Sequence, residues 1–74
     1  MNIHVKQEQG YGKWEFDLLN DAGEYVGMMI GTETRNGKIW EIRRFRNGDF
    51  DGAIMRLPAM TMLEATADAK IFCL

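Results

Sequence analysis

The sequence FRNGDFDGAI, in the second half of the chain, has oxygen-bearing side chains spaced as in a calcium-binding loop. Asn47, Asp49 and Asp51 occupy alternate positions and are followed by a glycine. Such a loop needs a bidentate glutamate at its twelfth position, where this chain has Pro58. Asn47 and Gly48 together are also a strong signal for a two-residue β-hairpin turn. We therefore predict a hairpin here, with no metal and no cofactor.

Few other residues could act in catalysis, because the chain has one histidine, one cysteine and no serine. Nothing in the spacing brings His4 beside Cys73 to form a catalytic dyad. Glu15 and Asp17 are spaced as paired catalytic carboxylates can be, but any alternating acidic strand shows this spacing. We expect that the chain is not an enzyme, that His4 is a surface residue, and that Cys73 is a small buried apolar residue.

The elements that would position these residues begin with five short runs in which apolar and polar residues alternate, as in half-buried β-strands. The runs are residues 3–7, 13–19, 25–34, 38–45 and 50–57. Turn-forming residues separate them, and Asn36–Gly37 and Asn47–Gly48 each predict a two-residue type I′ turn. The sequence therefore predicts an antiparallel β-meander.

The segment after Pro58 is alanine-rich and predicts a helix. Thr61 and Glu64 have the spacing of a capping box. An apolar stripe follows at helical spacing: Met62, Ala65, Ala69 and Phe72, with Leu63, Thr66 and Cys73 beside them. We expect an α+β fold, in which this C-terminal helix packs on one face of a four- to five-stranded meander, as a single domain spanning residues 1–74.

The composition is that of a folded globular protein, with 46% hydrophobic residues and a net charge of −2. The N-terminal residues lack an apolar run of signal-peptide length, and no stretch is long enough to span a membrane. We expect a cytoplasmic protein without a membrane partner.

The charged residues are distributed unevenly along the chain. Acidic residues dominate the first half, among them Glu15, Asp17, Asp21 and Glu24. Basic residues dominate the middle: Arg35, Lys38, Arg43, Arg44 and Arg46. Two interpretations stay open: opposite charges on neighbouring strands pair across the sheet, or two oppositely charged surfaces serve partners.

The alternation also predicts which residues face the helix. We expect that face to carry Trp14, Phe16, Val26, Met28, Ile30, Trp40 and Ile42. The opposite face would then carry Tyr25, Met29, Ile39, Glu41, Arg43 and Phe45. Aromatic residues, methionine and arginine are enriched at protein interfaces. Either a partner covers this face, or the sheet curls or bulges and buries it within the molecule.

These observations predict a non-catalytic protein-binding module. We expect Tyr25, Met29, Arg43 and Phe45 to be its anchors, with Glu41, Arg44 and Arg46 around them. The partner would be another protein, or a second copy in a homodimer. The most concrete form is a small inhibitor of the phage or mobile-element type, which occupies a surface of a larger host protein through the open sheet face and its charged hairpins.

The alternative is a nucleic-acid-binding protein. Its patch would combine Phe45 with the cations Arg35, Lys38, Arg43, Arg44 and Arg46, which could contact phosphates while the ring stacks on a base. The sequence pI of about 5.2 disfavours this alternative, because nucleic-acid-binding domains are usually basic.

Overall fold

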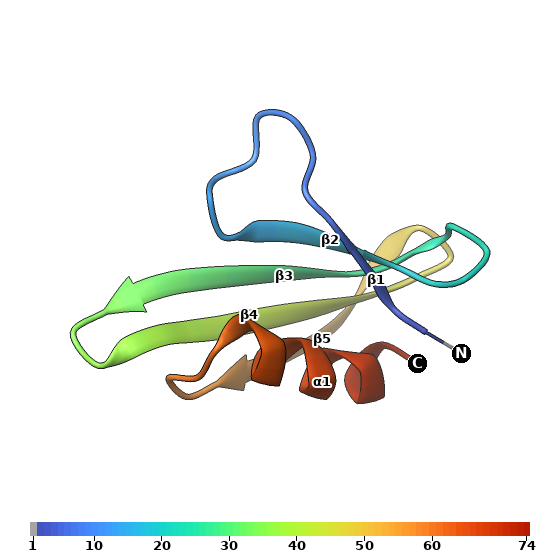
Figure 1. Ribbon diagram of the computed structural model, residues 1–74. Helices are drawn as coiled ribbons and strands as arrows, with labels where there is room; N and C mark the ends of the chain where they lie inside the picture. Colours follow the sequence, from blue (N-terminus) through green and yellow to red (C-terminus); the bar gives the residue numbers. More distant parts are fainter. Residues whose placement is uncertain (1) are drawn as a thin grey trace.

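The computed structural model, which describes residues 2–74, has two layers: one five-stranded antiparallel sheet and one helix on one of its faces (Figure 1). The strands lie side by side in chain order: β1 (His4–Lys6), β2 (Glu15–Leu19), β3 (Tyr25–Thr34), β4 (Gly37–Arg46) and β5 (Asp49–Leu57). Helix α1 (Met62–Cys73) packs against β3 and β4. The predicted meander and helix are confirmed, and the pairing of β1 with β2 makes the sheet five-stranded.

Helix α1 begins with the predicted capping box. The Thr61 hydroxyl accepts a hydrogen bond from the Glu64 amide at 3.2 Å, and the Glu64 carboxylate accepts one from the Thr61 amide at 3.1 Å. The buried residues of the helix are Ala65, Ala69 and Cys73, whose small side chains allow close packing on the sheet. Within residues 2–74, no helix combines the length and the apolar character needed to cross a membrane.

The two predicted tight turns have different outcomes. Asn47 and Gly48 both have positive φ, 54° and 83°, and join the paired residues Arg46 and Asp49, so this hairpin is confirmed. At the β3–β4 connection, Thr34 pairs with Gly37. The turn therefore consists of residues 35–36 and not of Asn36–Gly37. Gly37 is instead the first residue of β4, with a φ of 115° that glycine adopts without strain.

The predicted face of β3 is wrong at Met28, Met29 and Ile30. Met29 is fully buried and pairs with Ile42 on the helix side, whereas Met28 and Ile30 pair with residues of the opposite face. The cause is the register. A two-residue turn makes paired positions of β3 and β4 sum to an odd number, so even-numbered residues of β4 share a face with odd-numbered residues of β3 from Gly27 to Thr34. Tyr25 lies beyond a shift in the β2–β3 register, where Leu18 pairs with Gly27 and Leu19 pairs with Tyr25, and it is therefore on the other face.

The helix side of the sheet holds the core. Its buried strand residues are Phe16, Leu18, Met29, Trp40 and Ile42. Trp14 lies just before β2, is half-buried, and meets Trp40 edge to face with ring centroids 6.3 Å apart. Predicted core positions on β2 and β4 are therefore confirmed.

Two glycines of β3 also belong to the helix side. A Cβ atom on Gly27 would lie 2.7 Å from the Cys73 sulfur, and one on Gly31 would lie 2.7 Å from the Trp40 ring. Glycine is needed at both positions because the helix and the indole occupy the space of a side chain. The core-facing side of β3 thus contains few apolar side chains, and this is why the alternation pointed to the wrong face.

Candidate protein-binding face

The sheet face that points away from α1, called the open face below, carries a mixture of apolar and charged side chains. Cross-strand pairing and ring contacts place these residues on it: Tyr25, Met28, Ile30, Ile39, Glu41, Arg43, Phe45, Phe50, Ile54 and Arg56. Ile39, Phe50 and Ile54 are 44%, 45% and 39% exposed. Large apolar side chains are therefore accessible to a partner on three different parts of this face.

Three aromatic rings form a cluster at one end of the open face. The ring centroids of Tyr25 and Phe45 are 4.5 Å apart, and those of Phe45 and Phe50 are 5.9 Å apart, both with tilted planes. These separations lie in the range in which aromatic pairs attract one another. The cluster comes from β3, β4 and β5, so it forms only when these strands are paired in the native register.

A buried carboxylate lies beside this cluster. Asp17 on β2 is only 8% exposed, and the Tyr11 hydroxyl donates a hydrogen bond of 2.9 Å to its Oδ1. Burial and then the negative charge of Asp17 raise the pKa of Tyr25 to about 12. The hydrogen bond to Asp17 raises the pKa of Tyr11 as well. Sequence reasoning placed Asp17 on an acidic surface, whereas the structure shows it supporting the aromatic cluster.

The raised pKa of Tyr25 predicts a loss of stability in alkali. Tyrosine in an unfolded chain has a pKa near 10, so the folded state retains the Tyr25 proton more strongly than the unfolded state does. This stabilisation is complete below about pH 10 and disappears as the pH rises toward 12. Urea unfolding measured from pH 8 to 11 should therefore show a steeper decline for the wild type than for Tyr25→Phe. Equal slopes would contradict the burial of the Tyr25 hydroxyl.

The centre of the open face carries an ion-pair network. The Glu41 carboxylate accepts a hydrogen bond of 2.7 Å from Arg43 Nε and lies 3.5 Å from Arg56 Nε. The side chain of Glu41 is 25% exposed, whereas those of Arg43 and Arg56 are 44% and 75% exposed. One carboxylate is thus shared by two exposed guanidinium groups, which leaves this part of the surface with a net positive charge.

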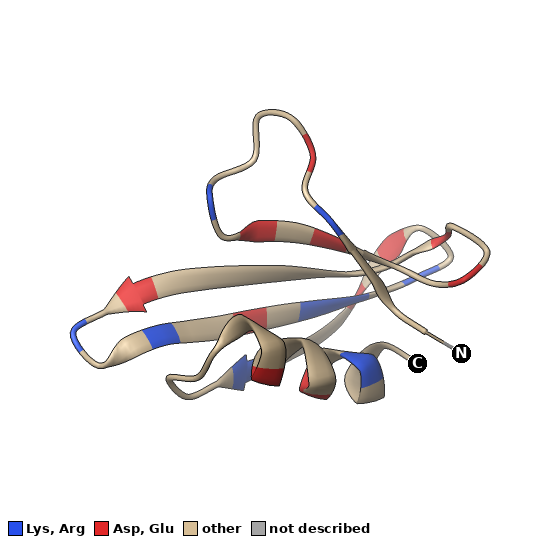
Figure 2. Cartoon of the chain, in the orientation of Figure 1, with Lys and Arg blue, Asp and Glu red and all other residues tan. Residues whose placement is uncertain are grey.

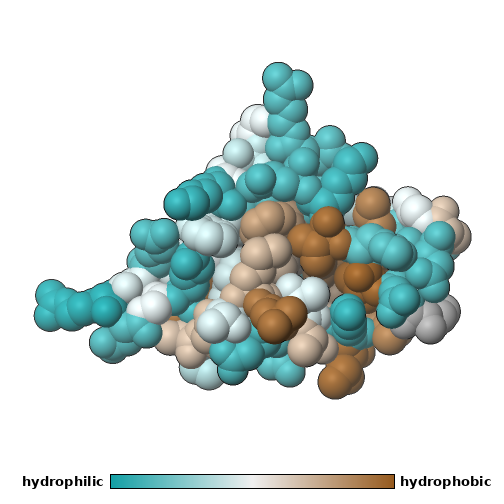
Figure 3. Space-filling view, in the orientation of Figure 1, coloured by the Kyte–Doolittle hydropathy of each residue, from teal (hydrophilic) through white to brown (hydrophobic). Residues whose placement is uncertain are grey.

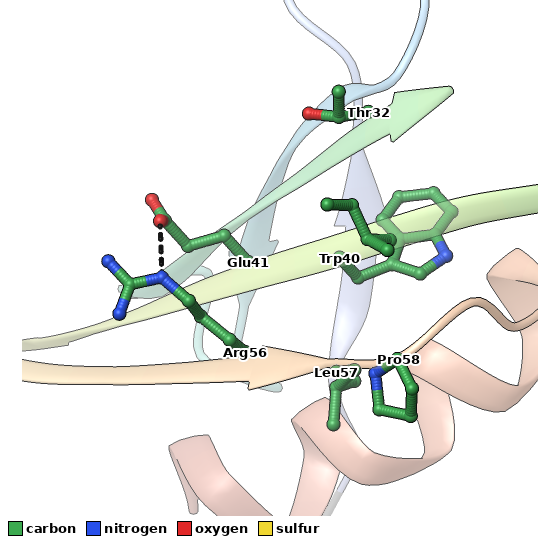
Figure 4. Close-up of a pocket in the computed structure, with 7 residues that line it drawn as sticks. Thr32, Trp40, Glu41, Arg56, Leu57 and Pro58 are labelled. Carbon is green, nitrogen blue, oxygen red and sulfur yellow. Dashed lines mark ion pairs between the residues drawn. The ribbon is translucent and has the colours of Figure 1, made fainter. Parts of the chain in front are cut away.

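A shallow hollow of about 310 Å³ lies beside the network (Figure 4). Its lining comes from Thr32, Ile39, Trp40, Glu41, Arg56, Leu57 and Pro58. Figure 4 shows the Glu41–Arg56 ion pair at one side of the hollow and Leu57 with Pro58 at another. A mainly apolar depression with a charged border is the kind of site that accepts an anchoring side chain of another protein.

The structure brings together four of the seven predicted site residues. Tyr25, Glu41, Arg43 and Phe45 lie on the open face as expected. The placement of Met29 there was wrong, and Arg44 and Arg46, which were expected around the anchors, lie on the helix side. Met29 belongs to the core for the register reason given above.

Arg44 and Arg46 stabilise the helix side of the molecule. Arg44 Nε donates to Asp51 Oδ2 at 2.6 Å, and its guanidinium lies over the Phe72 ring at 5.2 Å. Arg46 donates to the carbonyl oxygen of Cys73 at 3.1 Å, where the helix ends and its carbonyl groups lack helical partners. Even-numbered residues of β4 point toward α1, so Arg44 and Arg46 lie on the same side of the sheet as Trp40 and Ile42.

Sequence reasoning missed five residues of the open face: Met28, Ile30, Phe50, Ile54 and Arg56. Positions paired across a two-residue turn sum to an odd number, and this relation would have placed Met28 and Ile30 correctly. The pairs Phe45–Phe50 and Arg43–Ile54 differ in register, because a bulge interrupts β5 where Gly52 has a φ of 89°. An isolated glycine inside a strand run can mark a bulge, so Gly52 was the residue that could have located it.

Acidic and basic positions are interspersed along the strands of the sheet (Figure 2). Paired positions on neighbouring strands carry opposite charges: Glu33 with Lys38, Glu41 with Arg56, and Arg46 with Asp49. The cations proposed for nucleic-acid binding do not share a face, since Arg43 lies on the open face and Arg44 on the helix side. The geometry supports pairing across the sheet.

Acidic residues of the first half also have partners within the molecule. Asp21 lies 2.9 Å from the exposed His4 ring, and this hydrogen bond lowers the pKa of Asp21. Glu24 accepts a hydrogen bond of 2.9 Å from the Asn20 amide. They contribute to the local structure of the β2–β3 turn.

The remaining candidates for chemistry are separated or buried. Cys73 is 2% exposed, as predicted, and burial raises the pKa of its thiol. Within residues 2–74, no three His, Cys, Asp or Glu side chains gather in a way that could hold a metal ion.

No protein-family model matches the chain, and comparisons with curated proteins and with solved structures find no significant match.

Proposed function

We propose that the chain is a non-catalytic module that binds another protein through the open face of its sheet. The composition of this face carries the proposal, because aromatic rings, methionine and arginine occupy a surface that α1 does not cover. These residue types are enriched at protein interfaces. Contiguous apolar patches are seldom left in water by monomeric proteins unless they serve binding.

The charge of the open face suggests the chemistry of the partner. On the β4–β5 part of this face Arg43 and Arg56 share the carboxylate of Glu41, so one positive charge is available there for a carboxylate on the partner. The acidic residues Glu15 and Asp17 of β2 lie on another part of the same face. Phe50 and Ile54 supply accessible apolar area beside the two arginines. The partner surface would therefore combine apolar residues with an acidic side chain.

The most concrete form of this function is a small inhibitor of the phage or mobile-element type. It would occupy a surface of a larger host protein and block it without chemistry. The β3–β4 hairpin, with Arg35 and Lys38 near its tip, would extend the contact beyond the sheet face. This part of the proposal rests on analogy with small single-domain proteins of mobile elements.

Photo-crosslinking in the source cell tests the use of the open face. A benzophenone amino acid at Phe50 should cross-link a cellular protein of defined mass. The same amino acid at Leu63, on the outer side of α1, is the matched control. Cross-linking of the same protein from both positions, or of no protein from Phe50, would contradict the proposal. Cross-linking from Phe50 only to a second copy would assign the face to self-association.

Substitutions then measure the contribution of the anchors against the cross-linked protein in purified form. Phe45→Ala, in the middle of the aromatic cluster, should weaken binding by about 2 kcal/mol or more, the effect typical of a hot-spot residue. Arg43→Glu should weaken binding and reduce its dependence on salt. Gln9→Ala, in the exposed connection between β1 and β2, is the control and should bind like the wild type. Unchanged affinity of Phe45→Ala at full folding would exclude the aromatic cluster from the interface.

A further inference from the structure

The outer side of α1 presents a stripe of apolar residues to solvent. Leu63 and Ile71 are 82% and 80% exposed, and Ala67 between them is exposed as well. At about 100° per residue, these three residues lie on the side of the helix opposite the buried Ala65 and Ala69. Figure 3 shows hydrophobic side chains on the molecular face that carries α1. A helix that is apolar on both sides is usually covered on both sides.

The charges beside this stripe indicate what covers it. Asp68 and Lys70 lie on opposite sides of Ala67 around the helix axis. Asp68 is rotated by about 100° in one direction and Lys70 by about 60° in the other. When the α1 helices of two copies pack parallel, Asp68 of each copy comes beside Lys70 of the other. Antiparallel packing would instead bring Asp68 near Glu64 of the second copy, which has the same charge. The stripe is therefore complementary to itself in the parallel arrangement.

We propose that two copies of the chain associate through the stripe Leu63, Ala67 and Ile71, with their α1 helices parallel. The small Ala67 side chain lets the helix axes approach to about 8 Å. The product has four layers, sheet–helix–helix–sheet, and both open faces lie outermost. This dimer surface is separate from the proposed protein-binding face, so each dimer presents that face twice and gains avidity for a partner with two sites.

Sedimentation equilibrium tests the association. A contact between two helices of this length lies at the small end of specific interfaces, so the dimer fraction should rise with concentration up to about 1 mM. The average mass of the wild type should increase from 8.5 kDa toward twice that value. The double variant Leu63→Lys/Ile71→Lys should remain at the mass of one chain, with an unchanged circular dichroism spectrum, because both side chains are exposed.

The matched control places the same charges on the other surface. Ile39→Lys/Phe50→Lys on the open face should dimerise like the wild type. A wild type that remains monomeric throughout the series would overturn the proposal. So would a dimer that the open-face variant dissociates and the helix variant does not.

Cysteine cross-linking tests the parallel orientation. Two copies of Leu63 lie at the same height only when the helices are parallel, so Leu63→Cys should form a covalent dimer under mild oxidation. The native Cys73 is buried and should not compete. Ile54→Cys on the open face is the control and should remain monomeric. Cross-linking of Leu63→Cys no faster than this control would refute the parallel arrangement.

Charge exchange gives an independent measurement of the orientation. Asp68→Lys should weaken the dimer several-fold, because it sets two cations side by side at each flank of the stripe. The exchanged variant Asp68→Lys/Lys70→Asp should restore the wild-type dissociation constant. A failure of the exchange to restore it would also argue against parallel packing.

Discussion

Trp40→Ala is expected to leave most of the chain unfolded at 25 °C, with a loss of about 3–5 kcal/mol in the free energy of unfolding. The Trp40 side chain is 1% exposed, its ring lies over Gly31, and it packs against Trp14 in a T-shaped arrangement. Its indole N–H donates a hydrogen bond of 3.0 Å to the carbonyl oxygen of Met60, just before α1. The substitution thus removes the side chain that joins the sheet to the segment before β2 and to the segment before α1.

The expected loss is decisive because the domain is small. A core of this size rarely supplies more than about 3–5 kcal/mol of net stability, so the loss expected for Trp40→Ala is comparable to the total free energy of unfolding of the domain. Far-UV circular dichroism and urea titration measure it directly. The matched control is Ile39→Ala, one residue earlier on β4 and on the opposite face, where the side chain is 44% exposed. We expect a cost below about 1 kcal/mol there.

The comparison also tests the assignment of faces on β4. A cooperative transition of Trp40→Ala at the wild-type midpoint would contradict the central position of this side chain. A larger loss for Ile39→Ala than for Trp40→Ala would show that the two faces of the sheet had been exchanged.

Gly27→Val should displace α1 from the sheet, although valine favours strands more than glycine does. A Cβ atom at this position would lie 2.7 Å from the Cys73 sulfur, 3.0 Å from the Arg43 carbonyl oxygen and 3.2 Å from Leu18. The carbonyl belongs to the neighbouring strand and cannot move without breaking the β3–β4 ladder. Steric overlap therefore outweighs strand propensity, and we expect a loss of about 1–3 kcal/mol.

The thiol of Cys73 reports this displacement specifically. In the wild type the thiol is buried and its pKa is raised, so a disulfide reagent such as Ellman's should react slowly. In Gly27→Val the reaction should accelerate at least in proportion to the loss of stability, because the helix no longer covers the sulfur. Met28→Val, the next residue and on the open face, is the control. Equal thiol protection in both variants would show that Gly27 does not face the helix.

Several features of the fold were predictable because they depend on neighbours in the chain. The alternation of residues within β2 and β4, the positive-φ pair Asn47–Gly48 and the capping box of Thr61 each involve a few consecutive residues. Their energetics are local, so a strand, a turn or a helix start can be recognised from residue types alone. The order of the strands then follows from the short connections of a meander.

The open face was only partly predictable because its membership depends on pairing between strands. Glu41, Arg43 and Phe45 were placed correctly, since β4 has a continuous alternation with an unambiguous core side. Tyr25 of β3 was also placed correctly, and the ring of Phe45 is its contact on this face. On β3, by contrast, Gly27 and Gly31 face the helix, so this strand lacks the apolar side chains that would identify its helix-facing side.

The sequence by itself determined that this chain builds a four- to five-stranded meander and a capped helix, and that Tyr25, Arg43 and Phe45 would lie on the side of the sheet away from the helix. Only the tertiary structure decided that Met29 belongs to the core, that Arg44 and Arg46 fasten the helix, and which sheet residues share the open face. The physical reason is that a shift of one residue in pairing moves every side chain of a strand to the other face. Register is set by turns, bulges and contacts between distant residues.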